Sequence, residues 1–254
     1  MKLSNIIHKI NLNIHTIKYN LIMLFSMNNL ISFTLSLITG HYFLSTFSNF
    51  NELSIWYLLH CFANLYITAL SIEPIYYILE DPIYHIQNPT PFYDTIYIIL
   101  ILHIYHMIAF YCTKEDIFHH LCFVGIGSIT IFSFENGYYS ALAHFFICGF
   151  PGAIDYFFLF LYKQGYLEKN QRLKIAVFVN LWIRSPGLII ASSNFSIIKY
   201  IYSQKTLLNF IEMFFQVSTT FFNGQTYLQD VIYASGKNDI YNKKIISKSE
   251  SKKN

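Results

Sequence analysis

The chain has 254 residues, of which 54% are hydrophobic, 19% are aromatic and only 12% are charged. A soluble domain carries roughly twice that fraction of charged residues, so the composition indicates an integral membrane protein. The net charge of +3 is small, and no basic stripe in the sequence indicates a nucleic acid as partner.

Seven apolar stretches approach the ~20 residues that a membrane-spanning helix needs. They predict an all-α, polytopic membrane helix bundle with a multi-pass domain over residues 21–234. Residues 1–20 are expected to form a polar tail, not a cleavable signal peptide, and the lysine-rich residues 235–254 a disordered one. The seven predicted spans are Leu21–Phe47, Leu53–Leu79, Phe92–Cys112, Ile117–Phe134, Tyr138–Tyr162, Leu173–Tyr202 and Leu207–Tyr233.

The positions of lysine and arginine indicate the orientation in the membrane, because these residues accumulate in cytosolic loops. With seven crossings, Lys114, the basic residues of 163–174 and the six lysines of the C-terminal tail fall on one side. The loop 80–91 on the other side has neither Lys nor Arg. Lys205 and three N-terminal lysines oppose this arrangement, but its inverse fits worse. We expect a lumenal N-terminus and a cytosolic C-terminus.

The fourth stretch begins with Asp116-Ile117-Phe118-His119-His120. Residues three or four apart share a helix face, so Asp116 is placed to orient the imidazole of His119 or His120 and to fix which ring nitrogen carries the proton. A general base needs this arrangement. The alternative is that these residues only cap and solvate a helix end at the membrane interface.

Further ionisable residues lie inside the apolar stretches, where each needs a partner or water. Asp155 follows the Pro151-Gly152 pair and Arg184 precedes a second Pro-Gly pair, and both pairs predict a broken or kinked helix. Asp155 should face inward, either toward the histidine pair or in an ion pair with a histidine or Arg184. Ser140 and His144 are spaced to share a hydrogen bond. The residues expected to line a cavity beside the site are His103, His106, His144, Arg184 and Glu212.

The D-x-x-H-H pattern at Asp116–His120 resembles that of the TLC-domain superfamily, which includes the ceramide synthases and the translocating-chain-associated proteins. The stretch Asp155–Lys163 resembles the aspartate-bearing later helix of that superfamily. Together the motifs lie in a region of similarity from about Phe50 to Tyr233. The resemblance implies a six-helix TLC-like core, membrane lipids as partners and the endoplasmic reticulum as location. Of the ceramide-synthase H-D-x-x-D pattern, the chain keeps only the second aspartate.

The resemblance implies a protein that acts on or binds lipids. As an enzyme it would transfer an acyl group from a thioester such as acyl-CoA to a lipid amine or hydroxyl, without a resident cofactor. His119 or His120 would then be the base or nucleophile, oriented by Asp116 and Asp155. The alternative is a non-catalytic lipid-sensing, lipid-distributing or cargo-adaptor protein. A homo-oligomer is compatible with either hypothesis.

A metal-dependent membrane hydrolase or oxygenase is the third hypothesis. Ser140 and His144 with Asp155 resemble part of the membrane zinc amidohydrolase pattern, but the last apolar stretch lacks the histidines that complete it. We therefore expect no bound metal. A channel or transporter comes last, because the chain contains no inverted repeat. Without close C-x-x-C spacing, the four cysteines are expected to be small buried thiols, in neither a disulfide nor a zinc site: Cys61, Cys112, Cys122 and Cys148.

Overall fold

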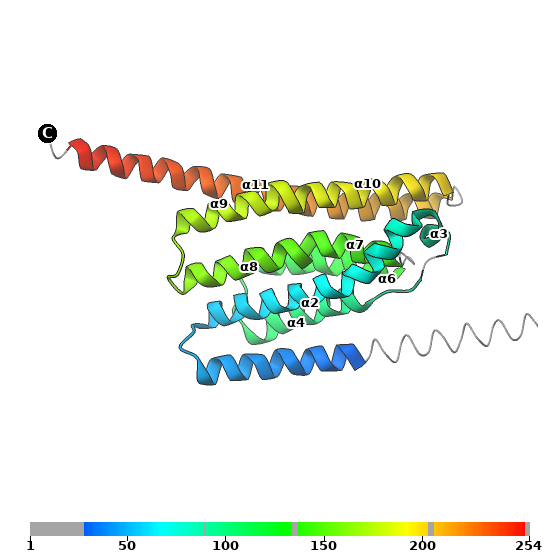
Figure 1. Cartoon of the computed structure of the whole chain (residues 1–254), viewed down its shortest axis with the longest axis horizontal. Coiled ribbons are helices and arrows are strands. Elements are labelled where there is room, and N and C mark those ends of the chain that lie inside the picture. The colour runs from blue at the N-terminus through cyan, green and yellow to red at the C-terminus, as the bar shows by residue number, and fades with distance from the viewer. Residues whose placement is uncertain (1–27, 89, 134–136, 203–205, 252–254) are drawn as a thin grey trace, which may run out of the picture.

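The computed structural model describes residues 28–88, 90–133, 137–202 and 206–251 (Figure 1). Within these ranges the chain is all helical and contains no strand. Four helices are long and apolar enough to cross a membrane, as expected for an integral membrane protein, and a fifth apolar helix is shorter. The four are Asn28–Phe47, Glu52–Glu80, Tyr138–Lys163 and Lys169–Ile197, and the shorter one is Asp94–Ala109.

After the N-terminal helix Asn28–Phe47, the described elements follow one another with short connections. Side chains cap several of them: Asn51 accepts a hydrogen bond from the Ser54 backbone N–H, and Asp81 from that of Tyr84, which satisfies amides that lack a partner inside the helix. In chain order the elements are α2 (Glu52–Glu80), α3 (Pro82–Gln87), α4 (Asp94–Ala109), α5 (Lys114–His119), the π-helical turn η1 (His120–Gly125), α6 (Ile126–Ser133), α7 (Tyr138–His144), the π-helical turn η2 (Phe145–Gly149), α8 (Phe150–Lys163), α9 (Lys169–Val179), the π-helical turn η3 (Asn180–Arg184), α10 (Ser185–Tyr202) and α11 (Leu207–Ser251).

Helix α2 occupies the centre of the bundle and packs against α4, α7 and α8, whereas α11 packs against α9 and α10. The long helical spans run roughly parallel to one long axis, and successive spans run in opposite directions; α7 with α8, and α9 with α10, each form one span (Figure 1). Ile55, Ile67 and Leu102 are almost fully buried in the apolar core between α2, α4 and the N-terminal helix. The many apolar side chains exposed on the outside, such as Phe62 and Trp182, are what a bilayer would cover.

The sequence predicted a broken or kinked helix at each of the two Pro-Gly pairs; neither pair ends its span, but each follows a π-helical irregularity. Pro151 is the second residue after η2, and Pro186 is the second residue after η3. A proline lacks an N–H and its ring clashes with the carbonyl four residues earlier. The wider π-helical turn before each proline accommodates it, so Tyr138–Lys163 and Lys169–Ile197 each continue as one span.

The C-terminal segment also differs from the expectation. Helix α11 is 45 residues long and continues past Ser235, where the composition predicts a disordered tail; its end extends beyond the other helices (Figure 1). No proline follows Leu207, and lysine is a good helix former, so nothing stops the helix locally. The predicted N-terminal tail, residues 1–20, and the part of the first predicted span before Asn28 lie outside the described residues.

Candidate functional site

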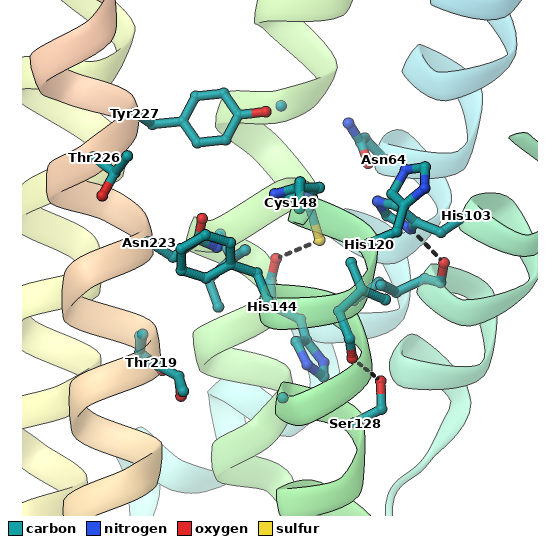
Figure 2. A pocket seen from close by; sticks show the side chains of 18 of the residues that line it. Asn64, His103, His120, Ser128, His144, Cys148, Thr219, Asn223, Thr226 and Tyr227 are labelled. Atoms are coloured by element: carbon teal, nitrogen blue, oxygen red, sulfur yellow. Dashed lines mark hydrogen bonds between the residues drawn. The ribbon is translucent and has the colours of Figure 1, made fainter. Parts of the chain in front are cut away.

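The helices surround a cavity of about 640 Å³, within the ~300–1,000 Å³ typical of ligand pockets. All three π-helical turns of the described chain contribute to its wall, and such turns are frequent at functional sites. Figure 2 shows His103 and His120 on one side of the cavity and Asn223 and Tyr227 of α11 on the other. The wall is apolar at Ile96, Ile99, Phe123, Val124 and Ile147, and polar at His60, Asn64, His103, His106, His119, His120, His144, Tyr156, Arg184 and Tyr227.

Five histidines from four elements, α2, α4, α5 and η1, form one cluster in this wall. His103 lies at the centre, with ring centroids 5.8 Å from His60, 5.7 Å from His119 and 4.9 Å from His120. The ring of His120 is also 5.1 Å from that of His106, and a hydrogen bond of 3.3 Å joins His106 Nδ1 to His120 Nε2. The expected proximity of these side chains is thus present, and His60 joins them.

The surrounding structure fixes several of these rings. His103 Nδ1 lies 2.6 Å from the Ile99 carbonyl oxygen, which can only accept, so Nδ1 donates and Nε2 of the neutral ring is the acceptor. Trp56 stacks on His106 with ring centroids 4.0 Å apart. Tyr156 stacks on His60 at 3.7 Å. The histidines are therefore held in defined orientations.

Asp116 lines the cavity, but its carboxylate is engaged in capping helix α5. Its Oδ2 accepts hydrogen bonds from the Thr113 backbone N–H at 2.9 Å and from the Thr113 hydroxyl at 2.8 Å, and Thr113 Oγ1 accepts from the Asp116 N–H. Burial raises the pKa of the Asp116 carboxyl. The hydrogen bonds from Thr113 and the imidazoles of His106 and His120 together lower the pKa by more than burial raises it, so the net pKa lies below its usual value. The capping alternative therefore describes Asp116 best.

Asp155 does not meet the histidines, contrary to the expected convergence. It is absent from the cavity wall, and its carboxylate oxygens lie 3.4 Å from Arg172 Nη2 and 3.8 Å from Arg184 Nη1. Two guanidinium groups attract a buried carboxylate more strongly than a neutral imidazole does. The structure therefore contains the alternative ion pair between Asp155 and Arg184. Arg172 is a second partner of Asp155, and the sequence did not single it out.

Of the other expected cavity residues, His103, His106, His144 and Arg184 all line the cavity. His144 Nδ1 is hydrogen-bonded to Thr95 Oγ1 at 2.8 Å, not to Ser140, whose hydroxyl donates to the backbone carbonyls of Gly137 and Phe92. The side chain of Glu212 lies outside the described residues, although its backbone belongs to α11.

Several lining residues were missed from the sequence. Asn64 is four residues beyond His60 on α2, so helical spacing could have suggested it. Tyr156 and Tyr227 were not distinguishable among 21 tyrosines.

One group of side chains is arranged to hold a metal ion. The ligand atoms of His106, Cys112 and His120 all lie within 4.8 Å of one another, and imidazole and thiolate are the donors that zinc prefers. All four cysteines are free thiols, but only Cys61 is fully buried; Cys112, Cys122 and Cys148 are partly buried, which differs from the expectation of buried thiols. Compared with known family models, curated proteins and solved structures, the chain matches none, so its function has to be inferred from this cavity.

Proposed function

We propose that this chain is an integral membrane protein that binds a lipid in the cavity and handles the polar group of that lipid at the histidine cluster. The observation that carries the proposal is the convergence of five imidazoles on one part of a cavity that elsewhere has apolar wall at Ile96, Val124 and Ile147. Burying ionisable side chains at membrane depth costs free energy unless they pair with one another, with water or with a ligand. The polar group of an amphiphile would bind the histidines, and its hydrocarbon chain would pack against the apolar wall.

Acyl transfer from a thioester, such as acyl-CoA, to a lipid amine or hydroxyl is the reaction that fits this site best. His120 Nδ1 is buried and has no hydrogen-bond partner among the described residues, so it is available as the base. It would take the proton of the lipid amine or hydroxyl as the nitrogen or oxygen of that group attacks the thioester carbonyl carbon. The carbon–sulfur bond then breaks, and the departing thiolate takes the proton back from the imidazolium. His119, beside it in the cavity wall, is the second candidate base.

Lipid binding without turnover is the alternative, and one observation favours it. Asp116 caps α5 and Asp155 pairs with arginines, so neither carboxylate orients an imidazole as the acyl-transfer hypothesis requires. In this version the protein senses or distributes lipids, or binds cargo, and the histidines hold the polar group of the ligand.

The membrane arrangement that accompanies this function has seven spans around a six-helix TLC-like core. The N-terminus is lumenal, the C-terminus is cytosolic, and the endoplasmic reticulum is the membrane. The start of α5 at Lys114, before Ile117, supports the TLC-like placement of the histidine pair within a helix.

A metal-dependent hydrolase is a second candidate function, favoured by the grouping of His106, Cys112 and His120. Elemental analysis of the purified protein distinguishes the two. About one zinc or iron per chain that is lost in Cys112→Ser and His106→Ala would favour the hydrolase. The acyl-transfer proposal expects no stoichiometric metal.

A lipidomic comparison tests the main proposal. Cells that contain the wild-type chain should differ from cells without it in one or more acylated lipid classes, and the His119→Ala, His120→Ala double variant should behave like cells without it. His85→Ala is the matched control, because His85 lies outside the cavity wall. Identical lipid compositions in all of these cells would exclude the acyl-transfer hypothesis. If the purified double variant still contained bound lipid, the hypothesis of lipid binding without turnover would then stand.

A further inference from the structure

A cluster of charged side chains with an excess positive charge lies against the cavity wall. Arg172 and Arg184 share one carboxylate, that of Asp155, so the trio retains a net charge of +1. Only Arg184 of the three lines the cavity, and its side chain is just 5% exposed. The acidic residues of the wall, Glu115, Asp116 and Asp230, form no ion pair with it in the described part of the chain. A buried charge without compensation is expensive.

Buried polar atoms without partners lie in the same wall. Among the described residues, both amide atoms of Asn64 and the Nε of Arg184 have no hydrogen-bond partner, although Asn64 is only 1% exposed. Native structures rarely leave such atoms unsatisfied. An unpaired amide and an unpaired guanidinium N–H in one cavity indicate a polar ligand that accepts hydrogen bonds.

Gly152 brings the two side chains together. A Cβ added at Gly152 would lie 2.6 Å from Asn64 Nδ2 and 3.7 Å from Arg184 Nη2, so both side chains approach α8 at this glycine, and any larger residue would displace Asn64. The guanidinium also lies 5.0 Å from the centroid of the Tyr227 ring.

This polar region adjoins the histidine cluster. Tyr227 contacts His119, with ring centroids 6.2 Å apart, and the tyrosine points across the cavity toward the side that bears Asn64 and His103 (Figure 2). A ligand group held at Arg184 would therefore lie beside the imidazoles, while an attached apolar chain could follow the wall formed by Ile96, Val124 and Ile147.

We propose that the ligand is an amphiphile with an anionic group, a phosphate ester or a carboxylate, bound by Arg184 and Asn64. This inference rests on the proposed lipid-binding function and specifies the chemistry of its ligand. The anion neutralises the excess charge and accepts the hydrogen bonds that Asn64 Nδ2 and Arg184 Nε do not make within the protein, and such charge-assisted bonds are the strong ones. Arginine suits planar recognition of carboxylate and phosphate.

Matched pairs of lipids test the proposal. The purified full chain, in neutral detergent, is given phosphatidic acid or the diacylglycerol with the same chains, and a fatty acid or the fatty alcohol of the same length. Native mass spectrometry measures occupancy. The wild type should prefer the anionic member of each pair by roughly tenfold or more, the equivalent of one charge-assisted hydrogen bond. Inorganic phosphate should not displace phosphatidic acid, because the apolar chain contributes to binding.

Variants separate direct contact with the anion from effects on folding. Arg184→Gln should abolish the preference and Arg184→Lys should retain part of it. Arg172→Gln is the comparison variant: it removes the other partner of Asp155, and with it the excess charge of the trio, but it leaves Arg184 in the cavity wall. It should therefore weaken the preference less than Arg184→Gln does. Asn64→Leu leaves the ion pairs intact and should reduce the preference several-fold while uncharged lipids still bind.

Equal binding of both members of each pair to the wild type would overturn the inference but leave lipid binding intact. Equal loss of preference in Arg172→Gln and Arg184→Gln would also overturn it, because the effect would then come from the ion-pair network. Displacement by inorganic phosphate would show a site for a free anion and not for an amphiphile. Binding of no lipid at all would instead contradict the proposed function.

Discussion

His106 and His120 lie 14 residues apart in sequence, yet their ring nitrogens Nδ1 and Nε2 are 3.3 Å apart. His106 lies near the end of α4, and His120 begins η1, directly after α5. The short connection 110–113 between α4 and α5 brings the two rings together. Because His120 Nε2 is engaged with His106, Nδ1 is the nitrogen that remains for a ligand. In the proposed function, His106 is therefore the partner of His120, and Nδ1 of His120 is the nitrogen that acts on the ligand.

His120→Ala should lower acyl transfer by about 10²–10⁴-fold, the usual contribution of a general base, with little change in lipid occupancy. A radiolabelled acyl-CoA assay in detergent measures the rate, and His85→Ala serves as control. A rate in His120→Ala equal to that of the wild type would exclude His120 as the base.

Asp155→Ala should destabilise the fold strongly, by about 3–5 kcal/mol, because it leaves Arg172 and Arg184 facing each other without their carboxylate. Thermal unfolding of the purified protein measures the change. Arg172→Gln should cost much less, since Asp155 keeps Arg184 and Arg172 is the more exposed arginine. Similar melting temperatures for Asp155→Ala and the wild type would mean that the ion pairs do not stabilise the bundle.

Gly187→Ala should destabilise the bundle by about 1–3 kcal/mol, the usual cost of overpacking. A Cβ there would lie 2.0 Å from Phe146 Cδ1, so α10 and η2 would have to move apart. Gly236→Ala is the matched control: its Cβ meets nothing within 4 Å, and alanine is the better helix former. Equal thermal stability of the two variants would contradict the close packing at Gly187.

The cap of α5 should weaken in acid. The pKa of Asp116 is lower in the folded chain than its ordinary value of 3.8, so the charged carboxylate stabilises the fold above that pH. This contribution is lost as the pH falls through the lower pKa of the folded state. The difference in melting temperature between the wild type and Asp116→Ala should thus be constant from pH 7 to pH 5 and shrink at pH 3. A difference that grows toward pH 3 would contradict this sign.

The sequence predicted much of the helix pattern because long apolar runs and their polar ends mark membrane spans directly. Leu53–Leu79 agrees with α2 to within one residue at each end, and the expected span Tyr138–Tyr162 agrees equally well with α7 to α8. The helical spacing of His103 and His106 also placed both in the cavity correctly.

The partners across the bundle could not be predicted, because they depend on how distant helices pack. Asp155 has an arginine 17 residues later as its partner, and no local pattern distinguishes this from pairing with a histidine. Cys112 lies beside His106 and His120 only because the α4–α5 connection turns back on itself. Two of the three π-helical turns, η2 and η3, directly precede the α-helical turns that contain Pro151 and Pro186, where the sequence predicted a broken or kinked helix.

The proposed orientation predicts opposite sides for two segments. A glycosylation acceptor placed between Asp81 and Pro91 should be modified in the lumen, and one placed after Ser235 should not. Modification of both would require an even number of crossings between them, and the seven-span arrangement would be wrong.

The central claim is that a lipid occupies the cavity beside the histidine cluster, and photo-cross-linking tests it most directly. The probe is a lipid with a diazirine in its acyl chain close to the polar group, added to the protein in membranes and mapped by peptide mass spectrometry. We predict adducts on cavity-wall residues such as Trp56, Phe123 and Tyr156, reduced by an excess of unlabelled lipid. Adducts confined to outward-facing residues such as Phe214 and Phe222 would contradict the claim.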